Sequence, residues 1–184
     1  MRSEREKMLA GEPYVAADAE LCELNMRAQA LLHDFNASRP EAFELRREVI
    51  WRLFGAVGSN FDVKQPFFCD YGSNIYAGDN LFINYDCVIL DCNVVRLGSN
   101  VLLAPKVQIY TAHHPLEPEA RRTLVEMASP VTIGDDVWIG GGVIICPGVT
   151  VGDGSTIGAG SVVTRSIPAR VFAAGNPCRV FREL

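Results

Sequence analysis

The chain of 184 residues lacks long hydrophobic runs, paired cysteine motifs and an excess of positive charge. Gly, Asn or a charged residue interrupts every apolar stretch well before the ~20 residues that a membrane-spanning helix needs. The N-terminal segment MRSEREKMLAGE has no apolar run typical of a signal peptide, and the six cysteines contain no C-x-x-C pair. We therefore expect a cytoplasmic protein in a reducing compartment, with no membrane span.

The charge balance limits the partners of the chain. Lys and Arg number 17 against 22 Asp and Glu, which gives a net charge of −5. A surface of this sign repels a phosphate backbone, so we expect no nucleic-acid binding. Apolar residues make up 48% of the chain, and folding at this length removes roughly 70% of the unfolded surface from water. The chain therefore needs no disulfide or metal to stabilise its core.

Two amphipathic helices are predicted before residue 60. From Asp18 to Asn36 the apolar residues fall three and four apart, with Asp18 as a candidate N-cap. The sequence from Ser38 to Glu41 fits a capping box for a second helix with apolar residues Leu45, Val49, Ile50, Leu53 and Phe54. Two such helices cannot form a core by themselves, so we expect residues 1–60 to be a helical cap on a larger body.

A six-residue repeat predicts that larger body. Seven consecutive units begin at Val131 and end at Phe172, each with a second apolar residue two places after its first and often a glycine after that. The same pattern runs from Ile75 through Val107, interrupted by two extra residues, Asn93 and Val94. It stops over residues 113–130 and resumes in phase. Such an excursion indicates a loop that leaves a regular coil and returns to it.

Apolar residues two apart suit a strand, and a Gly, Asn or Asp after them suits a corner with positive φ. Short strands and tight corners at fixed spacing predict a β-solenoid whose coils stack on one another. We therefore predict a mainly β fold. Residues 61–184 form the solenoid, with the excursion loop 113–130 and a basic C-terminal tail.

The V-x-I-G-x-x units and several longer motifs resemble the hexapeptide-repeat sugar O-acetyltransferases of the maltose and galactoside type. The longer motifs are EREKMLAGEPY, FFCDYGSNIYAGDNLFINYDCVILD, LLAPKVQIYTAHHPLEPEAR and AAGNPCRVFREL. The resemblance covers essentially the whole chain and implies a left-handed parallel β-helix. It also implies acetyl-CoA as donor, a sugar hydroxyl as acceptor, and a homotrimer whose active sites lie between adjacent subunits.

Acyl transfer from a thioester to an alcohol needs a base for the hydroxyl proton, and histidine is the natural base near neutral pH. The chain has three histidines. His33 lies on the first predicted helix, where we expect a structural role. His114 precedes Pro115 where the excursion leaves the coil, and the resemblance implies that it is the general base. The sequence leaves the role of His113 open.

The resemblance also implies the residues that bind the acceptor, namely Asn84, Asp70, Asp91 and Asp18. Each of them also suits an ordinary corner or cap position. The chain departs from the galactoside pattern here, with Asp70 in place of a serine, Cys92 in place of an acid, and Asp18 displaced from the usual aspartate. The acceptor is thus the least defined part of the expected site.

The donor side has a signal of its own, because the segment between Gly154 and Arg182 contains four arginines and no Asp or Glu. Arginine forks bind phosphates well, and coenzyme A carries several. A solvated basic tail is the alternative. The resemblance assigns the coenzyme A contacts to Gly141, Ala159, Thr164, Arg165, Arg179 and Arg182. Trp138 either walls the coenzyme A groove or packs between subunits.

Three other functions would suit parts of this sequence. A zinc carbonic anhydrase on the same coil needs three separated histidine ligands, which the adjacent His113 and His114 do not supply, so no metal site is expected. An acetyltransferase of a xenobiotic or an amino acid would use the same donor site. A non-enzymatic β-solenoid scaffold would need neither the excursion nor the arginine-rich tail.

Overall fold

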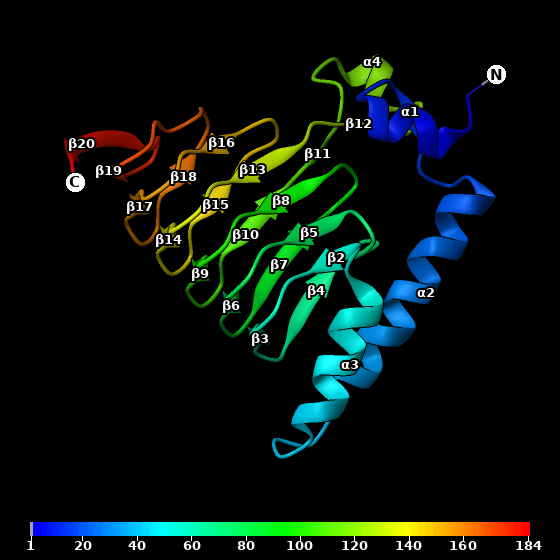
Figure 1. Cartoon of the computed structure of the whole chain (residues 1–184). Coiled ribbons are helices and arrows are strands. Elements are labelled where there is room, and N and C mark those ends of the chain that lie inside the picture. Colours follow the sequence, from blue (N-terminus) through cyan, green and yellow to red (C-terminus); the bar gives the residue numbers. More distant parts are fainter. Residues whose placement is uncertain (1) are drawn as a thin grey trace.

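The computed structural model describes residues 2–184 and consists of a stack of triangular coils with helices at one end (Figure 1). The N-terminal part contains α1 (Glu4–Ala10), β1 (Tyr14–Val15), α2 (Ala19–Asn36) and α3 (Phe43–Leu53). Within the described residues, no helix is both long enough and apolar enough to cross a membrane.

The solenoid has three parallel sheets, which we call faces 1, 2 and 3 in the order in which the chain visits them. Face 1 consists of β2 (Ala56–Val57), β5 (Ile75–Ala77), β8 (Val95–Leu97), β13 (Val131–Ile133) and β16 (Thr150–Val151). Face 2 consists of β3 (Asp62–Val63), β6 (Phe82–Ile83), β9 (Leu102–Leu103), β14 (Trp138–Ile139), β17 (Thr156–Ile157) and β19 (Val171–Ala174). Face 3 consists of β4 (Phe67–Cys69), β7 (Cys87–Leu90), β10 (Gln108–Tyr110), β15 (Ile144–Ile145) and β18 (Val162–Val163).

The C-terminal strand β20 (Arg179–Glu183) pairs antiparallel with β19 at the end of face 2. We name the three edges of the solenoid by the faces that they join. Edge 1–2 follows the strands of face 1, edge 2–3 follows those of face 2, and edge 3–1 follows those of face 3. These edges are where the chain turns, and they carry most of the polar groups discussed below.

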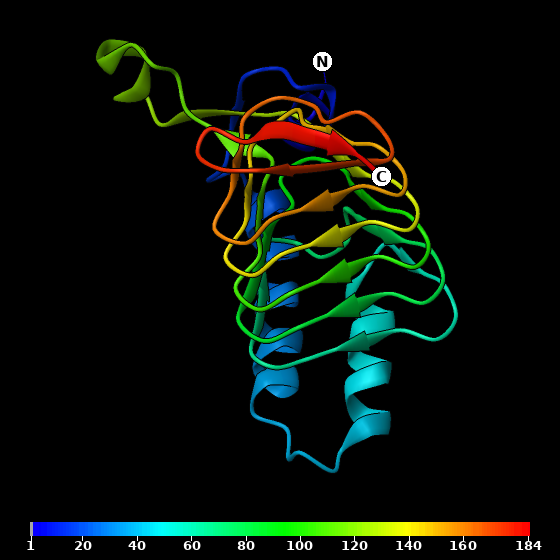
Figure 2. The ribbon, with the colours of Figure 1, turned by 90° about the vertical axis from the view of Figure 1, so that its left-hand side faces the viewer.

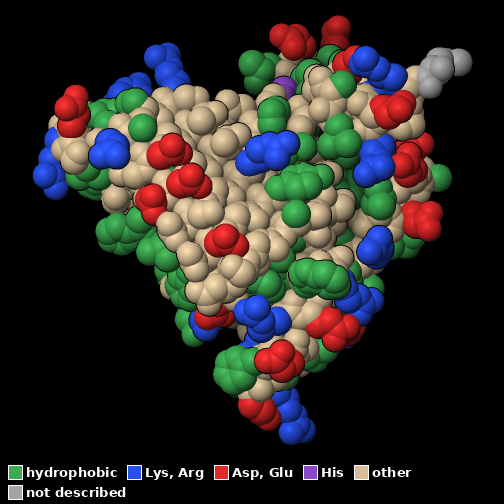
Figure 3. All heavy atoms as spheres, in the orientation of Figure 1, with side chains coloured by type: hydrophobic (Ala, Val, Ile, Leu, Met, Phe, Trp, Pro, Cys, Tyr) green, Lys and Arg blue, Asp and Glu red, His purple; other side chains and the backbone are tan. Residues whose placement is uncertain are grey.

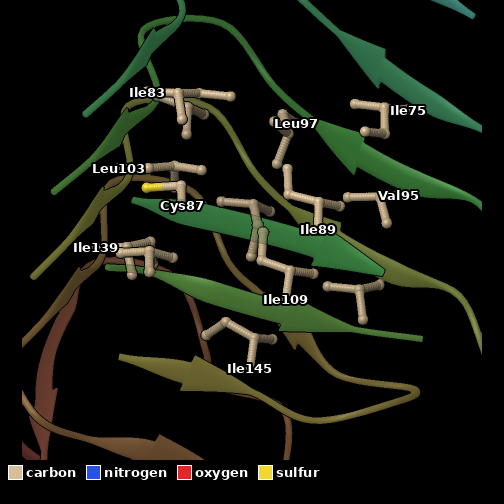
Figure 4. Close-up of a cluster of buried hydrophobic side chains, with 14 of the residues drawn as sticks. Ile75, Ile83, Cys87, Ile89, Val95, Leu97, Leu103, Ile109, Ile139 and Ile145 are labelled. Atoms are coloured by element: carbon tan, nitrogen blue, oxygen red, sulfur yellow. The ribbon is translucent and has the colours of Figure 1, made fainter. Parts of the chain in front are cut away.

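The six-residue repeat places its aliphatic side chains inside the coils, as predicted. The first residues of the repeat units are buried, from Val131 to Ile167 and from Ile75 to Val107. Strands stack in register, so that Ile89 lies beside Ile109 and Ile109 beside Ile145 (Figure 4). Each side chain therefore contacts its counterparts in the coils above and below, and the mainly β solenoid is confirmed.

The excursion is built from β11 (Ala112–His113), the short helix α4 (Pro118–Arg121) and β12 (Val125–Ala128). It projects from the side of the solenoid, with α4 at its tip (Figure 2). Strand β12 pairs with β11 on one side and with β1 on the other. Since Val131 then pairs with Val95, the coil resumes in register after the excursion.

Helix α2 covers the edge strand β4 with amide side chains. Asn36 pairs with Phe67 in both directions, since its Nδ2 donates to the Phe67 carbonyl and its Oδ1 accepts from the Phe67 N–H, both at 2.9 Å. The Nε2 of Gln29 donates to the Cys69 carbonyl at 3.0 Å. An open strand edge invites pairing with other chains. These amides satisfy part of that edge and attach the helical cap to the solenoid.

The details of the cap differ from the sequence prediction. The stripe of α2 and its N-cap Asp18 are confirmed. The capping box at Ser38 is wrong, because the Ser38 hydroxyl donates to the Phe35 carbonyl and α3 begins only at Phe43, with no side-chain cap. A capping box does occur at Ser3 and Glu6, where it starts the unpredicted helix α1.

Two further positions differ from expectation in this region. Leu45 is exposed, although the other apolar residues predicted for α3 are buried. The first solenoid strand, β2, already lies at Ala56–Val57, before the expected boundary at residue 60.

A ladder of asparagines holds edge 1–2. Asn60, Asn80 and Asn100 have φ between 57° and 58°, the left-handed conformation that asparagine tolerates better than most residues. The amide of Asn60 donates to Asn80 and that of Asn80 to Asn100, each at 2.8 Å, and Asn100 donates to Asp136 at 2.7 Å. The ladder thus joins four successive coils through side chains alone.

We expect Asn100→Ala to destabilise the fold more than Asn100→Gly. Both variants lose the two ladder hydrogen bonds of Asn100, worth about 1 kcal/mol each, but only alanine also meets the left-handed penalty of roughly 1–2 kcal/mol. Urea denaturation measures the two losses in free energy of unfolding. Equal losses in the two variants would show that the corner conformation contributes nothing.

Candidate active site

A pocket of about 550 Å³ lies beside edge 3–1, where the excursion, α2 and the solenoid meet. Its walls come from all three of these parts of the chain. They are formed by Ala16, Leu21, Cys22, Asn25, Met26, Asp70, Tyr71, Leu90, Cys92, Ala112, His114 and Glu126. The pocket thus includes two of the residues expected from the sequence, His114 and Asp70.

His114 lines this pocket, where β11 ends and the excursion leaves the solenoid. Its side chain is exposed within the single chain. The neighbouring His113 does not line the pocket, and its Nε2 lies 3.5 Å from the Ser129 hydroxyl. His33 is exposed on α2 and is likewise absent from the pocket wall. Of the three histidines, only His114 faces the cavity.

The two extra residues in the repeat, Asn93 and Val94, anchor the excursion. The side chain of Asn93 is buried, and its Nδ2 donates to the carbonyls of Met8 in α1 and Ala128 in β12, each at 3.0 Å. Its backbone N–H donates to the Thr111 hydroxyl at 2.9 Å. One amide therefore joins the solenoid, the N-terminal helix and the returning strand of the excursion, which fixes one wall of the pocket.

Asp91 is fully buried and does not line the pocket. Its Oδ1 accepts hydrogen bonds from the backbone N–H groups of Asp70 and Tyr71 at 3.0 and 2.9 Å, and its Oδ2 accepts from that of Asn74 at 3.2 Å. Burial raises the pKa of Asp91 to about 6, against the lowering effect of these donors. The structure thus places Asp91 under the loop 70–74, which it holds in shape.

We expect Asp91 to make the fold less stable as pH rises. Its pKa in the folded chain lies above the unfolded value of 3.8, so the folded state binds the proton more tightly. The stabilisation is present below pH 4 and is lost as pH rises through about 6, by up to about 3 kcal/mol. Urea denaturation of the wild type and of Asp91→Asn between these limits isolates this contribution.

The wild-type free energy of unfolding should fall relative to that of the variant across this window, because the variant has no titrating group at position 91. The Asp91→Asn variant also lacks one of the two oxygens that accept from the backbone N–H groups. This loss changes its free energy of unfolding by an amount that does not depend on pH. A difference between the two proteins that stays constant from pH 4 to pH 7 would contradict the assignment.

Asp70 lies in the pocket wall beside Cys92, whose thiol donates to Asp70 Oδ2 at 3.2 Å. Burial raises the pKa of this carboxyl, and the hydrogen bond from Cys92 opposes the rise. The Nδ2 of Asn25 in α2 donates to the Asp70 carbonyl at 2.8 Å. The position of Asp70 is therefore set from both the helical cap and the solenoid.

Among the residues of the pocket region that were not predicted, Glu126 and Tyr14 form a hydrogen-bonded pair. Glu126 comes from β12 of the excursion, and its Oε2 accepts a hydrogen bond from the hydroxyl of Tyr14 at 2.8 Å. The Tyr14 side chain is only 1% exposed, and Tyr14 and Glu126 face each other in the β1–β12 pairing. They are 112 residues apart, so no local sequence pattern could have connected them.

The remaining acceptor candidates lie outside the pocket wall. Asp18 caps α2 through its Oδ1, which accepts from the Glu20 N–H at 3.0 Å, and it sits in sequence between the lining residues Ala16 and Leu21. Asn84 lies on edge 2–3, where its Oδ1 accepts from the Tyr85 N–H at 2.8 Å. One strand of face 3 runs from edge 2–3 to edge 3–1, so the two edges lie up to about 20 Å apart along the extended chain.

The residues assigned to coenzyme A fall on different parts of the solenoid. Gly141 and Ala159 follow strands of face 2, so they lie on edge 2–3 with Asn84, and the Gly160 N–H donates to the Gly141 carbonyl at 2.9 Å. Thr164 and Arg165 follow β18 and lie on edge 3–1, the edge of His114. A single chain thus presents the expected site residues on two separate edges.

The arginines of the C-terminal segment are free to bind an anion. Arg165, Arg170, Arg179 and Arg182 are all exposed, and within residues 2–184 none of them forms an ion pair. Basic side chains gather at the end of the solenoid where β19 and β20 lie (Figure 3). This arrangement fits the phosphates of coenzyme A. The described residues contain no group of three or more His, Cys, Asp or Glu that could hold a metal ion.

Trp138 lies on the outer surface of face 2, where its side chain is 53% exposed. It is paired across the sheet with Leu102, which is 45% exposed. Neither side chain lines the pocket described above. Together they form an exposed apolar pair on face 2.

Comparison with known proteins gives matches along the chain. Residues 7–58 match the maltose acetyltransferase hexapeptide capping motif, and residues 130–165 match the bacterial transferase hexapeptide (six repeats). The galactoside O-acetyltransferase of Escherichia coli K12 is 44% identical over 179 residues, which cover 97% of this chain and 88% of the relative.

Two solved structures share the whole fold. The crystal structure of a maltose O-acetyltransferase from Clostridium difficile 630 is 48% identical with a TM-score of 0.98, over 100% of this chain and 98% of that one. A hexapeptide-repeat acetyltransferase from Vibrio cholerae, complexed with acetyl coenzyme A, is 39% identical with a TM-score of 0.92, over 100% and 99% of the two chains.

Proposed function

The chain belongs to the hexapeptide-repeat acetyltransferases of the maltose and galactoside type, and on that premise we propose that it transfers an acetyl group from acetyl-CoA to a sugar hydroxyl. The observation that carries the proposal is the position of His114, the one histidine in the wall of a pocket that also contains carboxylates. A sugar presents several hydroxyls, and carboxylates accept hydrogen bonds from them well.

In the proposed mechanism His114 is the general base of a direct transfer. Its imidazole takes the proton from the acceptor hydroxyl, the oxygen forms a bond to the thioester carbonyl, and the bond from that carbon to the coenzyme A sulfur breaks. The proton then passes from the imidazolium to the leaving thiolate, which regenerates the base. No acyl-enzyme is needed. A hydrogen-bond donor directed at the oxyanion that forms on the thioester carbonyl would lower the activation barrier further. We propose the backbone N–H of Gly141 as this donor.

The acceptor side of the site centres on Asp70 in the pocket, with Asp18 at its margin and Asn84 from edge 2–3. We assign Asp91 an indirect part, because both of its carboxylate oxygens are occupied by backbone N–H groups of residues 70–74. Its contribution to acceptor binding is to hold the Asp70 loop in place.

On the donor side, Arg165, Arg179 and Arg182 are proposed to bind the phosphates of coenzyme A, with Thr164 and Ala159 along the groove. Exposed arginines without ion-pair partners suit this role, because their guanidinium groups are available for bidentate contacts with phosphate. Trp138 is proposed to wall the same groove or to pack between subunits.

We further propose that the active protein is a homotrimer with shared sites. His114 and Asp70 belong to edge 3–1, whereas Asn84, Gly141 and Ala159 belong to edge 2–3, so a single chain cannot gather them around one reaction centre. A second copy that places its edge 2–3 against edge 3–1 of the first can do so. The exposed pair Leu102 and Trp138 supports such an interface, because a contact there would bury apolar surface.

The proposed compartment is the reducing cytoplasm. All six cysteines are free, and four of them are buried in the chain. Cysteines without disulfide partners suit a compartment in which disulfides do not form.

We expect His114→Ala to lower kcat by a factor of about 10²–10⁴, because the acceptor hydroxyl loses its base. Acetyl-CoA affinity should stay within about threefold of the wild type, since the proposed phosphate contacts are elsewhere. Thiol release with a panel of mono- and disaccharides measures turnover, and titration calorimetry measures acetyl-CoA binding.

His113→Ala is the matched control, since it removes the neighbouring imidazole, which does not face the pocket. If His114→Ala kept the wild-type turnover and His113→Ala lost it, His113 rather than His114 would be the general base. Thiol release with no sugar of the panel, but with an amine or amino-acid acceptor, would refute the sugar assignment.

A further inference from the structure

The pocket that contains His114 has an unbalanced charge. Its walls include two carboxylates, Asp70 and Glu126, and no lysine or arginine. Elsewhere on the same chain the acids near β1 and α1 have basic partners, as in the ion pair of Glu4 with Lys7. The two pocket acids form no ion pair within the described residues.

Asp70 is held so that part of its carboxylate faces the cavity. The Cys92 thiol donates to Oδ2 of Asp70. The backbone N–H of Asp70 donates to the Asp91 carboxylate, and the backbone carbonyl of Asp70 accepts from the Asn25 side chain. No hydrogen-bond donor from the described chain reaches Oδ1. The side chain is half-buried, so water screens this oxygen less than it screens a surface carboxylate.

Glu126 lines the same pocket but comes from a different element. It belongs to β12 of the excursion, and the hydroxyl of the buried Tyr14 donates to its Oε2. No donor from the described chain reaches Oε1. Tyr14 thus positions Glu126, because it is fixed in β1 and packs in the small core beneath the pocket.

We propose that Asp70 and Glu126 are specificity-determining residues that select an acceptor bearing an ammonium group, such as an amino sugar. This inference rests on the proposed function, since it defines the substrate class of the same site. An ammonium has three N–H donors, enough to reach both free oxygens Oδ1 and Oε1, and its positive charge offsets one of the two carboxylate charges of the pocket. A phosphorylated sugar would instead add a third negative charge.

The electrostatics of the pocket agree with this assignment. Burial and the nearby charge of Glu126 both raise the pKa of Asp70. A cation bound beside the two carboxylates would remove that repulsion. A protonated amine has no lone pair for attack, so the acetyl group goes to a hydroxyl of the same acceptor, whose proton His114 removes.

The test compares three matched acceptors near neutral pH. They are a methyl hexopyranoside, the same glycoside with an amino group at C2, and the same glycoside with a phosphate at C6. We expect kcat/KM for the amino glycoside to exceed that for the neutral one by on the order of tenfold, and the phosphorylated glycoside to be the poorest acceptor. The acetylated position is read from the product by nuclear magnetic resonance.

Variants assign the preference to the two carboxylates. Glu126→Gln and Asp70→Asn should each lower the ratio of amino to neutral kcat/KM by about threefold or more. Tyr14→Phe keeps the charge of Glu126 but frees its side chain, so the ratio should fall by less. Glu119→Gln is the matched control, because it removes an exposed carboxylate of the same excursion that does not line the pocket; its ratio should equal that of the wild type.

The outcomes separate this inference from the proposed function. Turnover of the neutral glycoside with no preference for the amino glycoside would overturn the inference and leave the sugar acetyltransferase intact. A preference that persists in both Glu126→Gln and Asp70→Asn, or an acetyl group found on the nitrogen, would also overturn it. Failure of all three glycosides as acceptors would refute the proposed function itself.

Discussion

The stacking of buried aliphatic side chains from coil to coil determines where every other part of the molecule lies. Ile89, Ile109 and Ile145 illustrate it, since each is in register with its neighbour in the next coil. This register aligns the corners of successive coils into three straight edges. Residues far apart in the sequence, such as Asn84 and Ala159, therefore share an edge, while residues six positions apart lie on different edges.

Interruptions of the repeat produce the candidate site. The regular coils supply mainly flat faces and straight edges. The extra residue Asn93 supplies a side-chain amide that holds both α1 and the excursion, and the excursion brings His114 and Glu126 into the same pocket wall as Asp70. Pairing of β12 with β1 closes this arrangement. The pocket thus depends on contacts between the N-terminal segment and the excursion rather than on the solenoid alone.

The sequence predicted the fold more fully than the site. A strict period of six identifies the inward positions directly, since alternate residues of a strand face the core. Polar residues have no such period. Asp91 looked like an acceptor ligand, yet its partners are backbone N–H groups that the loop 70–74 brings to it. Ser38 and Ser3 begin similar local motifs, but only Ser3 caps a helix, because a local hydrogen bond to the Phe35 carbonyl and a tertiary contact with Gln65 occupy the Ser38 hydroxyl.

In the proposed trimer, one site combines edge 3–1 of one subunit with edge 2–3 of another. Mixing of subunits tests this sharing: His114→Ala and Asn84→Ala, each expected to have little activity alone, are unfolded together in equal amounts and refolded. Random reassembly should restore about a quarter of the wild-type activity, because about one interface in four then carries both intact residues. Activity that stays at the level of the separate variants, in a mixture shown to have exchanged subunits, would contradict the account.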